Sequence, residues 1–373
     1  MASKRVTLEK VNPKLCWLYT PREGYYSYAN VGHAWARRLE ELHLLAEHVD
    51  IANYAQWATP TTPVKALGIA IGPLDLCKRV LEPHRRKVLH IAPDTDKLPQ
   101  DWVEYANEMD AVIVPSQWAY DVAVNSGVDE RGGNGHQAGP YRIEIVRHGI
   151  NPKIFKLGAG PRGGLFHTTT AVAFQERKGT EQLLRAYRSL LIAGTPGLPS
   201  LTVRIPERMR LLVDPSDTRA LRLNDLIPEL ENSGKFTVVP GPSLPPFNWA
   251  ELLMGLEAVV CPSRGEAFGM IPLEARACGT VPIMTTCTGH LEHFNLATDV
   301  PIMHGPAKPS WGNDPGLAPY ISVYAIEEAL LDYIRRGDEL RQALLLGHNK
   351  FIREWSWKNV LAPLVKLVEH FGG

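Results

Sequence analysis

Two glutamates lie in a stretch whose pattern suits the binding of a hydroxyl-rich ligand. Residues 258–279 read AVVCPSRGEAFGMIPLEARACG: an apolar strand, a glycine-containing loop and a helix that begins near Ile271. Glu266 falls in the loop and Glu274 in the second helical turn, so both carboxylates can accept hydrogen bonds from one elongated ligand. Gly269 lets the backbone approach that ligand, and the unpaired N–H groups of the helix start favour an anion. Most glutamate pairs at this spacing are solvated surface groups, and it is the surrounding string that makes this signal strong.

That string resembles the E-x7-E motif of the retaining glycosyltransferases of family 4, which have the GT-B fold. The matching letters are EAFG, PLEA and ACGTVP. The resemblance implies that Glu274 contacts the ribose of a nucleotide sugar, and that Glu266 contacts the transferred sugar. The donor-binding set implied in this way also includes three residues that follow Glu266: Phe268, Gly269 and Met270.

A second segment, Arg177-Lys178-Gly179 before a predicted helix, resembles the basic motif that holds the donor diphosphate in the same family. Two cations beside a pyrophosphate stabilise the leaving group as the sugar bond breaks. The alternative is a pair of solvated cations at a helix start. Many family members carry an arginine five residues before the lysine, where this chain has Ala173. Arg177 can compensate for that missing charge.

The first half of the chain offers further candidate residues near the acceptor and the donor phosphates. Gly24 and Tyr25 follow the first predicted strand; the resemblance assigns Gly24 to the donor and Tyr25 to the acceptor side. His90 ends an apolar run and is either a core residue or a group beside the reacting sugar. Asp94 follows it on the acceptor side. Of these residues, only His90 belongs to the candidate catalytic set, which it completes with Lys178, Arg177 and Glu266.

Asp94-Thr95-Asp96 is also a D-x-D triplet, which binds a metal in the other large glycosyltransferase fold. Three-residue matches are common by chance. The cations at Arg177-Lys178 and the helix amides already supply positive charge, so we expect no metal ligands and no required cofactor beyond the nucleotide-sugar substrate. A G-x-G-x-x-G fingerprint after a strand is missing from both halves, which counts against a dehydrogenase.

Short apolar runs alternate with amphipathic stretches, which favours parallel strands joined by crossover helices. The expected strands are Leu15–Tyr19, Val88–Ala92, Ala111–Pro115, Ile143–Arg147, Ala171–Phe174, Leu201–Ile205, Phe236–Val239, Ala258–Pro262 and Val281–Thr285. The expected helices are Trp35–His48, Gln100–Asn107, Gln117–Ser126, Thr180–Leu191, Ile326–Leu346 with a break near Gly337, and Trp357–Phe371. Arg131–Gly139 is expected to be a surface loop.

This alternation predicts an α/β protein of the GT-B class, with two Rossmann-like doubly wound domains facing a cleft. A glycine-rich stretch at Leu157–Gly164 marks the expected linker. The predicted division is an acceptor-side domain over residues 1–157 and a donor-binding domain over residues 158–356. The last helix, residues 357–373, is expected to pack back on the first domain.

The 373 residues are 45% hydrophobic and 21% charged, as in ordinary globular proteins, with 40 basic and 40 acidic side chains. This balance gives no general attraction to nucleic acid or to anionic membranes. The five cysteines form no C-x-x-C pair and several lie in apolar runs, which indicates buried thiols in a reducing compartment. The N-terminus lacks an apolar signal segment, and no run approaches the length of a membrane span. We therefore expect a cytoplasmic enzyme without an integral membrane segment.

The resemblance implies transfer of a sugar from a UDP-, GDP- or ADP-sugar to an acceptor hydroxyl with retention of configuration. The acceptor stays open between a saccharide, a lipid-linked glycan and a modified DNA base. A phage-type enzyme that glycosylates hydroxymethylated bases is one alternative, since Arg37-Arg38 and His84–Lys87 could contact phosphate. A nucleotide-sugar-binding protein without catalysis is another, motivated by Ala173.

Overall fold

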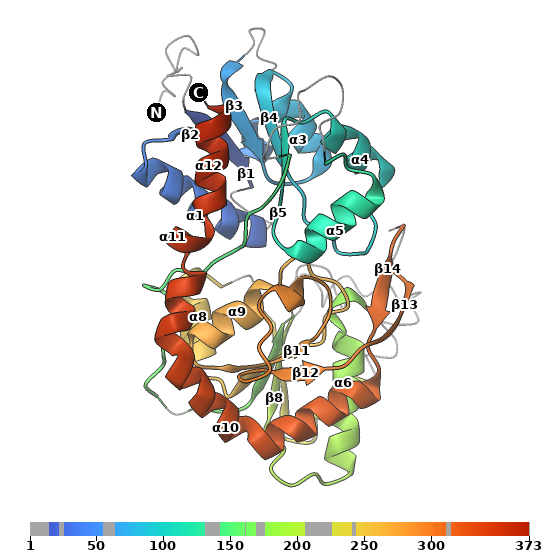
Figure 1. Cartoon of the computed structure of the whole chain (residues 1–373). Helices are drawn as coiled ribbons and strands as arrows, with labels where there is room; N and C mark the ends of the chain where they lie inside the picture. The colour runs from blue at the N-terminus through green and yellow to red at the C-terminus, as the bar shows by residue number, and fades with distance from the viewer. Residues whose placement is uncertain are drawn as a thin grey trace. The chain divides into compact units, whose positions relative to one another are not determined.

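The computed structural model describes residues 15–21, 26–54, 64–130, 142–160, 162–168, 176–205, 226–240, 244–310 and 315–372. The chain divides into two compact units, whose elements are labelled in Figure 1. Unit 1 comprises Met1–Pro93, Lys97–His148 and Trp357–Gly373, and unit 2 comprises Asp94–Asp96 and Gly149–Ser356. The change between units at Gly149 comes before the glycine-rich stretch at Leu157–Gly164.

Unit 1 is built on a six-stranded sheet in the order β2-β1-β3-β4-β5-β6, with every neighbouring pair parallel. Its strands are β1 (Cys16–Thr20), β2 (Leu45–Asp50), β3 (Val64–Ala70), β4 (His84–His90), β5 (Ala111–Val114) and β6 (Ile143–Ile145). Strands β1, β3 and β5 read as nearly continuous apolar runs because helices cover both faces of a parallel sheet, whereas β4 begins with the polar residues His84–Lys87.

Two hydrophobic clusters lie in unit 1. One contains α1 and α12 side chains with sheet residues, and the other contains side chains of α3, α4 and α5. The helices are α1 (Tyr26–Glu41), α2 (Ile51–Tyr54), α3 (Leu74–Leu81), α4 (Gln100–Asn107), α5 (Gln117–Ser126), α11 (Trp357–Val360) and α12 (Ala362–Phe371). The helices predicted at Gln100 and Gln117 are confirmed, and Ser116 caps α5 by accepting from Ala119 N at 3.1 Å.

The helix predicted over Trp35–His48 is wrong at both ends. Helix α1 begins at Tyr26 and ends at Glu41, and Leu45–Asp50 form strand β2 beside β1. His43 takes a left-handed conformation with φ 56°, and Leu44 N bonds to Leu39 O at 2.9 Å. This turn closes the helix, and Leu45, which continued the helical pattern, begins strand β2 instead.

Unit 2 has a second six-stranded parallel sheet, in the order β12-β11-β10-β7-β8-β9. Its strands are β7 (Leu165–Thr168), β8 (Leu201–Ile205), β9 (Phe236–Pro240), β10 (Ala258–Cys261), β11 (Val281–Thr285) and β12 (Val300–Ile302). A separate antiparallel hairpin joins β13 (Gly305–Pro309) and β14 (Leu317–Tyr320). The predicted doubly wound α/β class with Rossmann-like domains is confirmed.

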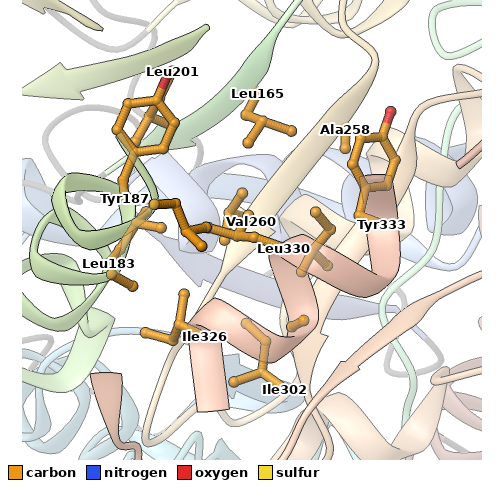
Figure 2. Packing of buried hydrophobic residues seen from close by; sticks show 14 of the residues in the cluster. Leu165, Leu183, Tyr187, Leu201, Ala258, Val260, Ile302, Ile326, Leu330 and Tyr333 are labelled. Atoms are coloured by element: carbon orange, nitrogen blue, oxygen red, sulfur yellow. The ribbon is translucent and has the colours of Figure 1, made fainter. Parts of the chain in front are cut away.

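One large core cluster of unit 2 packs α6 (Thr180–Ile192) and α10 (Val323–Trp355) against the sheet. Figure 2 shows Leu183 and Tyr187 of α6 and Ile326, Leu330 and Tyr333 of α10 around sheet side chains. Helices α8 (Pro246–Met254) and α9 (Met270–Ala277) pack on each other, and Trp249 of α8 packs on Phe166 of β7 with ring centroids 5.8 Å apart.

The break predicted near Gly337 is absent: α10 runs without interruption from Val323 to Trp355. A β-carbon at position 337 would lie 3.0 Å from Tyr333 Cε2, so the glycine makes room for the tyrosine ring inside a regular helix. The amphipathic stretch Trp357–Phe371 is two helices, α11 and α12, with Pro363 in the first turn of α12.

The five cysteines are all buried and unbridged, as expected. Of the helices that the structure describes, none is both long and apolar enough to cross a membrane. Several sequence predictions lie outside the described residues: the loop Arg131–Gly139, the strand Ala171–Phe174 with Ala173, and the residues Gly24 and Tyr25.

Candidate active site

The candidate site of unit 2 lies at the carboxyl ends of three neighbouring strands. The chain segments that follow β7, β10 and β11 lead to the 3₁₀ turn η2 (Glu176–Lys178), to helix α9 and to the 3₁₀ turn η4 (Thr288–Glu292). Since the strands are parallel, all three segments leave the same edge of the sheet, which is where open α/β sheets bind ligands.

Two cations and one carboxylate meet at this edge. Lys178 Nζ bonds to Glu266 Oε1, and Arg177 Nη1 lies 3.4 Å from Glu266 Oε2. Arg177 also donates to Gly265 O at 2.8 Å. Burial acts to raise the pKa of Glu266, but the charges of Lys178 and Arg177 outweigh it and hold that pKa well below its usual range. Glu266 is therefore ionised at neutral pH and pairs with both cations, while Asp94 pairs with Arg177 alone.

A buried arginine that the sequence analysis did not select joins the same loops. Arg264 N donates to Arg177 O at 2.7 Å, and the Arg264 guanidinium pairs with Glu176. Its Nε donates to Pro319 O in β14 at 2.8 Å. Arg264 is only 2% exposed. The sequence did hold a signal for this residue, because Arg264 comes directly after an apolar strand and before a glycine. An arginine at such a place is buried only when several hydrogen-bond acceptors surround it.

The turn that carries the cations has no room for a side chain at its end. Gly179 has φ 64° and precedes α6, and a β-carbon there would lie 2.2 Å from the carbonyl oxygen of Pro262. The close approach of these two backbones brings the Arg177-Lys178 turn against the loop that carries Glu266.

Glu274 lies inside the fold, 4% exposed, and its Oε2 accepts a hydrogen bond of 2.7 Å from Trp249 Nε1. Burial raises the pKa of Glu274 to about 8, against the opposite effect of the tryptophan bond. A strongly perturbed carboxyl beside a ligand-binding edge is typical of functional sites. Trp249 was missed because its apolar helix reads as ordinary core.

The residues between the two glutamates shape the helix start. Gly269 takes a left-handed conformation with φ 85° immediately before α9, and Met270 is the half-buried first residue of that helix. The Phe268 ring is buried against His293 and Trp355, with centroids 5.2 and 6.0 Å away. Its side chain therefore belongs to the core, and its carbonyl oxygen lies 3.1 Å from His293 Nε2.

His90 lies in unit 1, at the end of β4. Its ring is buried among Tyr28, Trp35 and His148, with centroids 5.7–6.3 Å apart. Neither ring nitrogen of His90 has a hydrogen-bond partner among the described residues, and burial lowers the pKa of His90 to about 4.

The D-x-D carboxylates are engaged separately within unit 2. Asp94 Oδ1 lies 3.0 Å from Arg177 Nη1, whereas Asp96 Oδ1 accepts from Leu317 N at 2.6 Å. In the part of the chain that the structure describes, no group of three or more His, Cys, Asp and Glu side chains gathers as metal ligands would.

Residues 168–298 match the family model described as glycosyl transferases group 1. This segment of the chain is similar to the glycosyl transferases of group 1. The matched segment contains the Arg177, Lys178, Glu266 and Glu274 side chains described above.

Similar proteins include the D-inositol 3-phosphate glycosyltransferases of Mycobacterium avium and Stackebrandtia nassauensis. The first is 32% identical over 169 residues, covering 42% of this chain and 35% of the relative. The second is 28% identical over 218 residues, covering 55% and 46%. The chain spans about a third to a half of the length of these curated relatives.

Solved structures share the fold over nearly the whole chain. HepE of Anabaena in complex with UDP-glucose has a TM-score of 0.65 at 12% identity and covers 95% of this chain and 100% of its own. Sucrose-phosphate synthase of Thermosynechococcus elongatus has a TM-score of 0.59 at 14% identity, with coverage of 95% and 98%. These likenesses confirm the predicted GT-B fold class.

Proposed function

We propose that this chain is a retaining glycosyltransferase that transfers a sugar from a nucleotide diphosphate sugar held by unit 2 to an acceptor hydroxyl. The observation that carries the proposal is the cluster of Arg177, Lys178 and Glu266 at the carboxyl edge of the unit 2 sheet. A neighbouring buried carboxyl, Glu274, provides the acceptor that ribose hydroxyls need.

In the proposed reaction, the donor diphosphate lies against the two cations. Their ion pairs with Glu266 are partly replaced by ion pairs with phosphate oxygens. The bond between the anomeric carbon and the β-phosphate oxygen breaks while the acceptor oxygen bonds to the same face of that carbon. The acceptor proton passes to the departing phosphate oxygen. Lys178 and Arg177 stabilise the negative charge that develops there, and Glu266 orients the sugar once the cations turn to the phosphates.

A uridine nucleotide is the first donor to test, because the fold neighbour HepE is described in complex with UDP-glucose. D-inositol 3-phosphate is one acceptor to test, because it appears in the names of the relatives. The proposed site needs no metal, since its cations and helix amides already face the diphosphate.

Some of the basic residues that motivated the DNA-modifying alternative are engaged within the protein. Within the run His84–Lys87, His84 is buried and bonded to Tyr19 and to Ala66 O, and Arg86 pairs with Asp110 at 2.7 Å. Arg38 pairs with Glu41 at 3.2 Å. A gel shift with duplex DNA at rising salt decides this point, because phosphate contacts weaken steeply with salt.

The test of the proposal is an activity assay with UDP-glucose, GDP-mannose and ADP-glucose, each with and without EDTA. We expect one donor to be consumed, by slow hydrolysis when no acceptor is present, at a rate that EDTA leaves unchanged. NMR of the released or transferred sugar should show the donor's anomeric configuration in the initial product. Inverted product would contradict retention, and a rate that needs Mn²⁺ or Mg²⁺ would bring the D-x-D triplet back as a metal site.

A further inference from the structure

The segment that follows β11 packs unusually closely on the loop that carries Glu266. Gly289 N donates to Glu266 O at 2.7 Å, and Thr288 Oγ1 accepts from Glu266 N at 3.2 Å. A β-carbon on Gly289 would lie 2.3 Å from Ala267 backbone atoms. Thr288 has φ 54°, a left-handed conformation that residues with a β-carbon rarely adopt. The chain therefore accepts backbone strain to hold these two segments together.

The residue placed by this packing is His290, whose side chain is 1% exposed. Its Nδ1 lies 2.9 Å from Thr285 Oγ1, and the Thr285 hydroxyl donates to Ser263 O at 2.7 Å. Since that hydroxyl proton is committed, Thr285 Oγ1 accepts from Nδ1–H. This network assigns the tautomer in which Nε2 carries a lone pair.

Nε2 lies beside the sugar-side loop. A β-carbon on Gly269 would lie 2.2 Å from His290 Cδ2 and 2.6 Å from Nε2, so only glycine leaves room for this imidazole. Within the described ranges, no hydrogen bond reaches Nε2. Nε2 is not among the fully buried unpaired atoms of the described side chains, so it is open to a ligand that donates a hydrogen bond to it.

The charge state of the ring decides what kind of ligand suits it. Burial lowers the pKa of His290 to about 4, although the nearby Glu266 carboxylate acts to raise it. The ring is therefore neutral at pH 7, and its lone pair would repel a phosphate oxygen. A hydroxyl group, which donates a proton, is the complementary ligand.

We propose that His290 Nε2 accepts a hydrogen bond from one hydroxyl of the transferred sugar and thereby helps to select that sugar. This inference rests on the proposed function, in which the sugar lies beside Glu266 and the start of α9. The phosphates are assigned to Arg177 and Lys178 and the ribose to Glu274, so the sugar hydroxyls are the donors left for His290.

The test compares wild type with His290→Asn. An asparagine amide can still donate to Thr285, as Nδ1–H does, but it has no atom at the Nε2 position. The probes are UDP, UDP-glucose and the 2-, 3-, 4- and 6-deoxy analogues of UDP-glucose, with dissociation constants from calorimetry. The exposed His304 provides a matched control, His304→Asn.

For each ligand, the dissociation constant is divided by that of UDP for the same protein. In wild type, we expect this ratio to be about tenfold higher for one deoxy analogue than for UDP-glucose, because the analogue lacks one hydrogen bond. In His290→Asn, that same analogue and UDP-glucose should bind equally, while His304→Asn keeps the wild-type ratio. Identical analogue ratios in wild type and His290→Asn would overturn the inference alone. Failure of wild type to bind UDP or any of these sugars would overturn the proposed donor assignment, and this inference with it.

If His290→Asn does not fold, a crystal structure of wild type with UDP-glucose decides the question. A sugar hydroxyl oxygen within about 3.2 Å of His290 Nε2 supports the proposal. A bound sugar with no hydroxyl within that distance overturns it.

Discussion

At the scale of single residues, the site combines carboxyl groups that burial and charge perturb in opposite directions. The cations hold Glu266 ionised, whereas burial raises the pKa of Glu274 to about 8. Pairs of titratable groups with separated pKa values commonly mark functional sites. Here the ionised group faces the cations, and the neutral one, bonded to Trp249, is the group that we propose for the ribose.

The raised pKa of Glu274 makes a prediction about stability. Between pH 4.5 and about 8, the folded chain keeps a proton on Glu274 that the unfolded chain has released. Stability therefore falls as pH rises through this range. Glu274→Gln, which cannot ionise, should lose this part of the pH dependence, so its stability relative to wild type should improve by more than about 1 kcal/mol between pH 5 and pH 8.

Urea unfolding of both proteins at the two pH values measures this difference. Glu251→Gln, on the exposed surface of α8, is the matched control and should follow wild type. A constant difference between Glu274→Gln and wild type across the range would contradict a buried, protonated Glu274.

At the scale of elements, the site depends on turns that bring backbones together. Gly179 and Gly194 flank α6, and both have left-handed φ values, 64° and 61°. A β-carbon at Gly179 would meet the Pro262 carbonyl at 2.2 Å, whereas one at Gly194 would meet nothing within 4 Å. Gly194→Ala should therefore cost only the conformational penalty, about 1–2 kcal/mol.

Gly179→Ala should lower the free energy of unfolding by the same conformational penalty and, in addition, by the clash with the Pro262 carbonyl oxygen. It should also displace the Arg177-Lys178 turn. We expect a lower thermal midpoint than for Gly194→Ala and a weaker affinity for UDP, which Gly194→Ala leaves intact. Equal midpoints and equal UDP affinities for the two variants would show that the close approach at Pro262 does not position the cations.

The sequence predicted most helices and strands, but not all of their ends. Alternating patterns located most strands and the helices at Gln100, Gln117 and Thr180, because buried parallel strands and amphipathic helices leave strong local signals. They failed at Leu45–Asp50, where a left-handed turn at His43 ended a helix that the leucine spacing would have continued.

The candidate site was likewise predictable only where chemistry-bearing residues share a motif. Glu266 and Glu274 lie in one such string, and Arg177-Lys178 lies in another. Trp249, Arg264 and His290 were not found. Each lies against a residue distant in sequence, which is Glu274, Glu176 and Gly269 respectively. The sequence left His90 open between a core residue and a site residue, because the aromatic rings that surround it in unit 1 come from segments far apart in the chain.

At the scale of the whole molecule, the chain enters unit 1 a second time at its end. Leu361, Leu364, Leu367 and Val368 are fully buried in a cluster that also contains Trp35 and Leu39 of α1. Replacing Leu364 by alanine should destabilise unit 1 by about 2–5 kcal/mol, as for other leucines buried in cores.

Hydrogen exchange by mass spectrometry can locate that loss. Protection should fall in α1 and the unit 1 strands, whereas Leu346→Ala, at a position 89% exposed on α10, should change neither unit. Loss of protection confined to α10 and unit 2 would mean that α12 does not complete the unit 1 core.

The most direct test of the account is a calorimetric titration of UDP and UDP-glucose into wild type, Lys178→Met, Glu274→Ala and a surface control, Arg188→Ala. The account predicts one saturable site per chain in wild type and in Arg188→Ala. Lys178→Met should bind at least about tenfold more weakly, because a charge-assisted hydrogen bond contributes about 1.5–3 kcal/mol. Glu274→Ala should bind about two- to tenfold more weakly, because the Glu274 carboxyl is neutral at pH 7 and a neutral hydrogen bond contributes about 0.5–1.5 kcal/mol. Wild-type affinity in both Lys178→Met and Glu274→Ala would contradict the assignment of this edge of unit 2 as the donor site.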